Sequence, residues 1–150
     1  MLKKIVFVVS FFILLSLVSL GVNRWAYFEV QKRLKVEVSG EYRPAFLLPA
    51  FHVRNARFTW QDKVQLIKGD VQVYFDLLSL LSPSGLRIII ESQNSQIRFL
   101  GAWAAQQGVE EALIQQLKVD MVIGSKKVKE IRFAEVKSPS FQFSIKDADN

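Results

Sequence analysis

The sequence predicts a mainly β protein, in which an N-terminal transmembrane helix precedes a curved antiparallel β-sheet, shaped like a groove, with one or two short helices. Three observations support this fold class. An uncharged apolar run opens the chain, apolar and polar residues alternate with a period of two from Phe51 onward, and short polar breaks interrupt the strands. The length of 150 residues fits one folded body behind the anchor.

The apolar run covers residues 5–22 and contains no charged residue. A helix of this length rises about 27 Å, which is enough to span the hydrocarbon core of a bilayer. A cleaved signal peptide is the alternative, since Ser19-Leu20-Gly21 offers a small-x-small site, but its apolar region normally has only about 7–15 residues. Lys3 and Lys4 favour an inside N-terminus. We therefore expect a single-pass signal anchor over residues 1–22, with the body on the outer side.

Residues 23–44 are expected to form an interfacial helix, a stalk and a hinge. No Gly or Pro follows the apolar run until Gly40, so the helix should continue to about Leu34 before residues 39–44 break it. Trp25, Tyr27 and Phe28 lie where an interfacial aromatic belt would be. The β-sheet domain is then expected over residues 45–150.

Period-two alternation predicts the strands of this domain. Val71, Val73 and Phe75 alternate with polar or less apolar neighbours, and residues 116–124 and 141–145 follow the same pattern. Two stretches are predicted to be helical instead. LLSLLS at residues 77–82 suggests one helical turn, and residues 102–117 place the following residues at helical spacing: Val109, Ala112, Leu113 and Leu117.

A polar break interrupts the strand RIIIESQNSQIRFL at residues 87–100. Ile88 and Ile90 differ in parity from Ile97 and Phe99, so a regular strand would place the two pairs on opposite faces. A β-bulge at the break would restore one apolar face and would bend the strand. The break at Asn94 has similar counterparts at Asn55 in the segment of residues 51–60 and at Ser138 in the segment of residues 134–143, although the apolar residues of the last segment do not change parity. Bent strands laid side by side predict a curved sheet.

These segments together resemble the AsmA/TamB-like group of bacterial envelope proteins. The resemblance rests on the membrane helix and its basic continuation ending in VSG, on LLPAFHVRNARFTW, on KGDVQVYFDLLSLLSPSGLRIIIESQN, and on KEIRFAEVKSPSFQFSI. It covers about residues 24–145 and includes no invariant catalytic motif. It implies a β-groove with a lipid-compatible interior, an inner-membrane location facing the periplasm, and a role in phospholipid movement or outer-membrane integrity. The length of the chain matches only the N-terminal portion of such a groove.

The sequence argues against an enzyme, a metal site or a cofactor. The chain has no cysteine and one histidine, His52, whereas a metal site needs three or four ligands. No glycine-rich phosphate loop is present. The formal net charge is +6, but the basic residues are dispersed and form no nucleic-acid-binding motif, so nucleic acid is not an expected partner.

The expected partner is membrane lipid, contacted by an apolar inner face of the sheet. The candidate residues of this face are Val71, Val73, Phe75, Ile88, Ile90, Ile97, Phe99, Phe141 and Phe143. Two alternatives remain open. In one, the protein is an envelope assembly or scaffold protein that binds another envelope protein through a sheet edge or its apolar face. In the other, the apolar face closes on a helix at residues 109–117 as an ordinary core.

Overall fold

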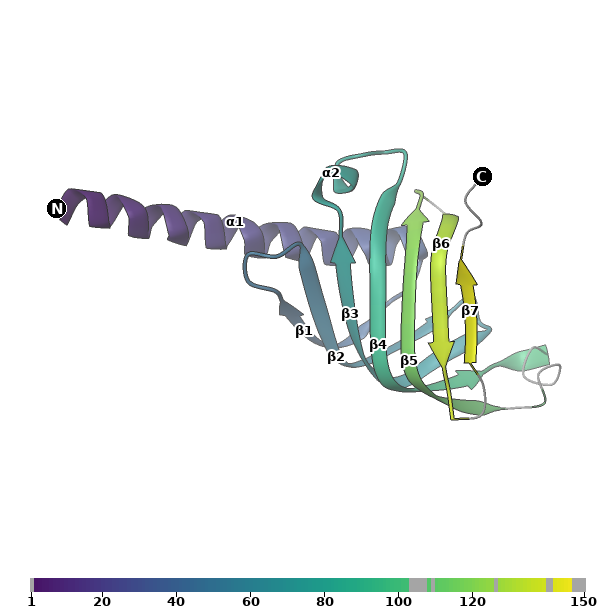
Figure 1. Cartoon of the computed structure of the whole chain (residues 1–150). Helices are drawn as coiled ribbons and strands as arrows, with labels where there is room; N and C mark the ends of the chain where they lie inside the picture. Colours follow the sequence, from purple (N-terminus) through teal and green to yellow (C-terminus); the bar gives the residue numbers. More distant parts are fainter. Residues whose placement is uncertain (1, 103–107, 109, 126, 140–141, 147–150) are drawn as a thin grey trace.

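The chain folds into one long helix followed by an open antiparallel sheet (Figure 1). The computed structural model describes residues 2–102, 108, 110–125, 127–139 and 142–146. The elements are α1 (Leu2–Leu34), β1 (Ser39–Pro44), β2 (Ala50–Trp60), β3 (Val64–Phe75), α2 (Leu77–Leu80), β4 (Leu86–Phe99), β5 (Glu111–Ile123), β6 (Val128–Lys137) and β7 (Gln142–Lys146). The predicted fold class is confirmed, including the helical turn at α2.

The seven strands pair in chain order, so each strand lies between its sequence neighbours and β1 and β7 form the two edges. Cross-strand register separates the two faces. One row of directly paired residues is mostly polar and consists of Arg43, His52, Gln72, Glu91, Lys118 and Glu135. The adjacent row is mostly apolar and consists of Tyr42, Val53, Val71, Ser92, Leu117 and Val136. The apolar row belongs to the inner face, which is turned toward α1, and the polar row to the outer face.

The sheet bends along a line that crosses β2, β3, β4 and β5. In each of these strands, residues of one parity face inward before the bend, and residues of the other parity face inward after it. On β4, Ile90 and Ser92 face inward before the bend and Ser95 and Ile97 after it. Asn94 adopts a left-handed φ of 50° at this point, and Asn55 does the same on β2. The polar breaks predicted at these two residues are therefore bends that keep one face apolar, as expected.

The bend differs from a simple bulge. β4 and β5 keep one register through it, because Gln93 opposes Gln116 and Ser95 opposes Ile114. The ladders between β2 and β3 and between β3 and β4 shift locally and then resume their register. An extra residue in one strand alone would change the register beyond it. The strands instead bend together, so the whole sheet folds.

Small side chains line the inside of the bend. We call this set the crease: Ala56, Gly69, Ser92 and Ser95. A Cβ at Gly69 would lie 2.5 Å from Ser95 Oγ, so glycine is required for close approach there. The hydroxyls of Ser92 and Ser95 hydrogen-bond to each other, and Ser92 also donates to the Asp70 carbonyl at 2.9 Å. The crease is thus tightly packed and its buried hydroxyls are paired.

Two sequence predictions are wrong. The predicted helix at residues 102–117 is contradicted over residues 111–117, which form the first part of β5; residues 103–107 and 109 lie outside the described residues. Pairing with β4 decides this segment, because residues 111–117 continue the antiparallel ladder with β4 and gain inter-strand backbone hydrogen bonds there. The third polar break is also not a bend. Ser138 follows the end of β6, and β7 begins at Gln142, so this segment connects two strands.

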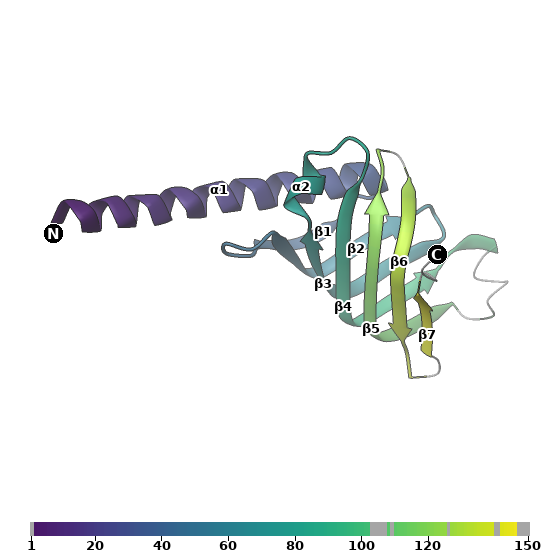
Figure 2. The ribbon, with the colours of Figure 1, turned by 45° about the horizontal axis from the view of Figure 1, so that its top comes forward.

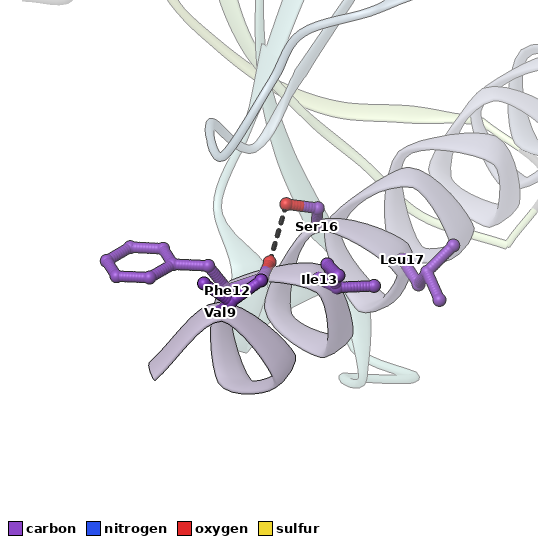
Figure 3. A pocket seen from close by; sticks show the side chains of 5 residues that line it. All are labelled: Val9, Phe12, Ile13, Ser16 and Leu17. Atoms are coloured by element: carbon purple, nitrogen blue, oxygen red, sulfur yellow. Dashed lines mark hydrogen bonds between the residues drawn. The ribbon is translucent and has the colours of Figure 1, made fainter. Parts of the chain in front are cut away.

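The helix α1 has two parts with different surroundings. Over residues 5–22 its side chains are largely exposed and apolar, and α1 is long and apolar enough to cross a membrane. Val9, Phe12, Ile13 and Leu17 surround Ser16 on this part (Figure 3). The Ser16 hydroxyl donates to the Phe12 carbonyl at 2.7 Å, which satisfies it within the helix, as a lipid surrounding requires.

The second part of α1 packs against the inner face of the sheet. Its buried residues recur every three or four positions and are Asn23, Ala26, Tyr27, Val30 and Arg33. Asn23 contacts the loop between β1 and β2, whereas Arg33 contacts the end of β5. From Asn23 to Arg33 the helix rises about 15 Å, and three strand spacings, from β2 to β5, amount to about 14 Å. The two lengths agree, so α1 runs across the strands. Figure 2 shows the strands fanning along α1, with β1 nearest the apolar part.

The residues assigned from sequence to a stalk and hinge therefore hold two packed elements. Residues 23–34 form the covering helix, and residues 39–44 form the edge strand β1. The predicted end of the helix at Leu34 is confirmed.

Candidate functional site

An apolar groove of about 370 Å³ lies between the second part of α1 and the inner face of the bent sheet. Its lining comes from α1, from the connection after it, and from β2 to β6. The sheet contributes Phe51, Val53, Phe58, Trp60, Val64, Leu66, Val71, Val73, Ile90, Ser92, Ser95, Ile97, Ile114, Leu117, Val119, Met121, Val128, Ile131 and Val136. The volume falls within the range of about 300–1,000 Å³ that is usual for ligand pockets.

Part of this lining remains exposed to solvent. Trp60 is 40% exposed and Ile131 is 45% exposed. Val71, Ile90 and Ile97 are half-buried, in contrast to Val73 at 4%. The described part of the chain thus leaves the groove incompletely covered, and the alternative of a closed core under a helix at residues 109–117 is contradicted.

The structure brings together only part of the predicted site. Val71, Val73, Ile90 and Ile97 line the groove. Phe75 and Ile88 are fully packed in the core with Leu80 of α2, beyond one end of the groove. Phe99 pairs with Val64 and is half-buried but is not part of the lining. Phe143 opposes Val136 in the ladder, and nothing is described of its side chain; Phe141 lies outside the described residues.

Sequence reasoning missed the wall that α1 provides. Tyr27, Val30, Gln31 and Leu34 line the groove from the helix. Their spacing of three and four residues is the signal that could have identified them, because it marks a helix face that packs against protein.

The connection between α1 and β1 forms a further part of the wall, through Val36 and Val38. Gln31 holds this connection: its carbonyl accepts from Val36 N at 3.1 Å, and its side-chain Oε1 accepts from Val38 N at 2.8 Å. The Tyr27 hydroxyl donates to the Val38 carbonyl at 3.1 Å. These bonds satisfy polar groups that border an apolar space.

An aromatic cluster lies where α1 meets β1 and β2. The ring of Tyr27 is 4.8 Å from that of Tyr42 and 5.4 Å from that of Phe51, between centroids. The Arg24 guanidinium lies 5.0 Å above the Tyr42 ring. Burial raises the pKa of Tyr42, and its buried hydroxyl has no hydrogen-bond partner among the described residues. The cluster fixes α1 on the sheet at the edge nearest the apolar run.

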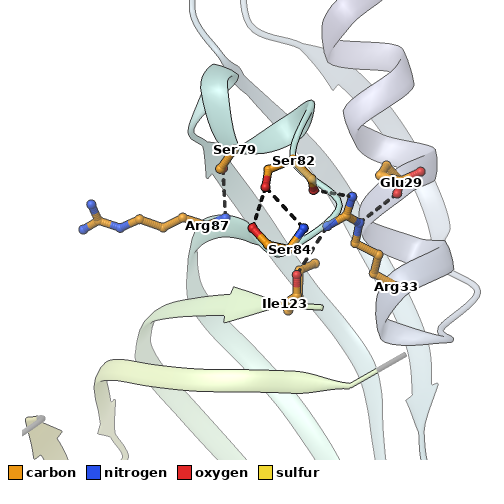
Figure 4. A network of polar contacts seen from close by, with 7 residues as sticks. All are labelled: Glu29, Arg33, Ser79, Ser82, Ser84, Arg87 and Ile123. Carbon is orange, nitrogen blue, oxygen red and sulfur yellow. Dashed lines mark hydrogen bonds and ion pairs between the residues drawn. The ribbon is translucent and has the colours of Figure 1, made fainter. Parts of the chain in front are cut away.

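Arg33 fixes the other end of the packed helix (Figure 4). This buried side chain donates to Glu29 at 2.7 Å and, at 3.4 Å each, to the carbonyls of Ser82 and Ile123. A buried guanidinium needs such partners, because an unpaired charge there would be costly. Arg33 therefore ties α1 both to the α2–β4 loop and to the end of β5.

The outer face carries ion pairs across β4 and β5. Arg98 pairs with Glu111 at 2.6 Å, and Glu91 with Lys118 at 2.7 Å. The hydrogen bond from Arg98 lowers the pKa of Glu111, and that to Glu91 raises the pKa of Lys118. Such exposed pairs contribute little stability but mark this face as the one in water.

The chemistry of the groove is that of an apolar binding surface. Among the described lining residues, the side chains that can donate a hydrogen bond are those of Tyr27, Gln31, Trp60, Ser92 and Ser95. Among the described residues, no group of three or more His, Cys, Asp or Glu side chains could hold a metal ion. Comparisons with protein-family models, with curated proteins and with solved structures gave no match.

Proposed function

We propose that this protein is a membrane-anchored, non-enzymatic lipid-binding protein whose groove holds the acyl chains of phospholipid. The observation that carries the proposal is the apolar groove beside a helix suited to the membrane. An apolar surface of this extent is unfavourable in water unless something covers it. Lipid is the most abundant apolar ligand next to a groove that is attached to a bilayer.

The placement of the groove supports this ligand. Since α1 crosses the strands and continues into the apolar run, β1 is the strand nearest the membrane and β7 is the farthest. The groove lining extends from β2 to β6 in this direction. An acyl chain could therefore leave the bilayer beside α1 and enter a continuous apolar surface.

The AsmA/TamB-like resemblance of the sequence supports a location in the inner membrane, with the sheet in the periplasm. It also supports a role in phospholipid movement or outer-membrane integrity. We include both in the proposal.

Photo-crosslinking tests the ligand. p-Benzoylphenylalanine would replace Ile131 in the groove, and the adjacent Glu130 on the outer face would be the matched control. Ile131 is 45% exposed, so a larger side chain should be tolerated. Val71 and its neighbour Gln72 provide a second matched pair on β3. The full-length protein would be irradiated in bacterial cells, purified and weighed by mass spectrometry.

We expect phospholipid adducts at Ile131 and Val71 and none at the two control positions. Protein adducts at the groove positions would overturn the proposal in favour of the envelope scaffold. Folded protein without any adduct at the groove positions would also overturn it.

A further inference from the structure

The loop between β1 and β2, residues 45–49, exposes three consecutive apolar side chains. Phe46 is 64% exposed, Leu47 39% and Leu48 58%. Figure 1 shows this loop extending beside α1 in the direction of the N-terminus. The patch is thus adjacent to the apolar part of the helix rather than to the sheet.

Asn23 fixes the position of the loop along α1. Its Nδ2 donates to the Ala45 carbonyl at 2.8 Å and to the Leu48 carbonyl at 3.0 Å, and the residue is only 1% exposed. Asn23 is the first residue after the uncharged run of residues 5–22. The base of the loop therefore lies at the level where the apolar run ends, and its tip extends along that run.

Hydrogen bonds pair the backbone at the base of the loop. Besides the two carbonyls bound by Asn23, Ala45 N donates to the Ala50 carbonyl at 3.0 Å and Ala50 N to the Leu48 carbonyl at 2.8 Å. The Pro49 carbonyl accepts from Phe75 N at 3.0 Å, and Pro49 has no N–H group. The paired groups at the base of the loop, next to the apolar run, are therefore satisfied within the protein, as a bilayer surrounding requires.

The conformation of Leu47 gives an independent indication. Its φ of 57° is left-handed, where asparagine or glycine is favoured, yet the residue is an exposed leucine. An exposed apolar side chain in a strained conformation is consistent with a binding role.

We propose that Phe46, Leu47 and Leu48 insert among the acyl chains of the leaflet at which the apolar run of α1 ends, as a fixed apolar wedge beside the helix. The proposal requires α1 to span the membrane, and it holds whether or not the groove binds lipid. The wedge would hold the β1 edge of the sheet against the bilayer surface.

The absence of cysteine from the sequence allows a direct test with single-cysteine variants. Phe46→Cys and Leu48→Cys would be labelled with the fluorophore NBD, and Asp62→Cys in the exposed turn between β2 and β3 would be the control. The full-length protein would be reconstituted in vesicles of phosphatidylethanolamine and phosphatidylglycerol, with and without lipids that carry a nitroxide on the acyl chain.

We expect blue-shifted emission and several-fold stronger nitroxide quenching at positions 46 and 48 than at position 62. Equal, weak quenching at all three positions, with strong quenching by aqueous iodide, would overturn the wedge. A Leu14→Cys label within the apolar run verifies in the same vesicles that α1 is inserted. The lipid adducts at Ile131 report separately on the groove, so the two proposals can fail independently.

Discussion

The bend at Asn94 provides the sharpest test of how the sequence shapes the groove. Its φ of 50° lies in the left-handed region, which costs most residues roughly 1–2 kcal/mol because Cβ approaches the backbone. The side chain is exposed, so replacing it removes little packing. We therefore expect Asn94→Val to lower the free energy of unfolding by about 1–2 kcal/mol, and Asn94→Gly to change it by less than about 0.5 kcal/mol.

Asn94→Gly is thus expected to be more stable than Asn94→Val, which is the reverse of the order that strand propensity predicts. Valine favours strands, whereas glycine weakens a regular strand by roughly 0.5–1 kcal/mol. Gln93→Val is the matched control, since Gln93 is the exposed neighbour and is not among the residues with positive φ. Its stability should be unchanged or slightly higher.

Urea unfolding of the full-length protein in detergent micelles, followed by the circular dichroism of the sheet, measures these differences. Equal stability of Asn94→Val and Asn94→Gly would refute the assignment of the bend to backbone conformation. An equal loss in Gln93→Val would refute it as well, because the effect would then belong to any valine on this surface.

Three further predictions concern the crease and the aromatic cluster. Gly69→Ala should lower the free energy of unfolding by about 1–3 kcal/mol in the same assay, because the new Cβ would lie 2.5 Å from Ser95 Oγ. Adding Ser95→Gly to this variant should restore part of the lost stability. Tyr42→Phe should raise stability by up to about 1 kcal/mol by removing an unpaired buried hydroxyl, whereas Tyr27→Phe should lower it by about 1 kcal/mol. Because burial raises the pKa of Tyr42, this tyrosine ionises in the unfolded chain before it ionises in the folded protein as pH rises through about 10. The free energy of unfolding of the wild type should therefore fall in this pH range, and that of Tyr42→Phe should fall less. An identical alkaline stability profile of the two proteins would contradict this.

Local alternation was sufficient to predict the sheet but not the element that covers it. Val73 and Phe75 have the same parity on β3 and are both buried in the core, yet only Val73 also lines the groove. No pattern within β3 separates them, because the difference arises from elements packed above the strand. Tyr27 was likewise assigned to a membrane belt, since an aromatic residue after an apolar run fits a headgroup region and a protein interface equally well.

The two errors in the sequence prediction arise because a local pattern fits more than one structure. Leu113 and Leu117 are spaced as in a helix, but Ile114 faces the groove and Leu113 is 50% exposed, as pairing with β4 requires. The polar segment after Lys137 resembles the bend at Asn94 in composition, yet it connects two strands. Asn, Ser and Pro favour turns and bends alike, so composition alone cannot separate them.

Because the strands pair strictly in chain order, the fold can be assembled in the order in which the chain emerges. Contacts between sequence neighbours close quickly, since little loop entropy is lost. Each new strand would add to a sheet that is complete up to that point. Only β1 and the most recent strand would then offer unpaired backbone groups to another chain, which limits mispairing during folding.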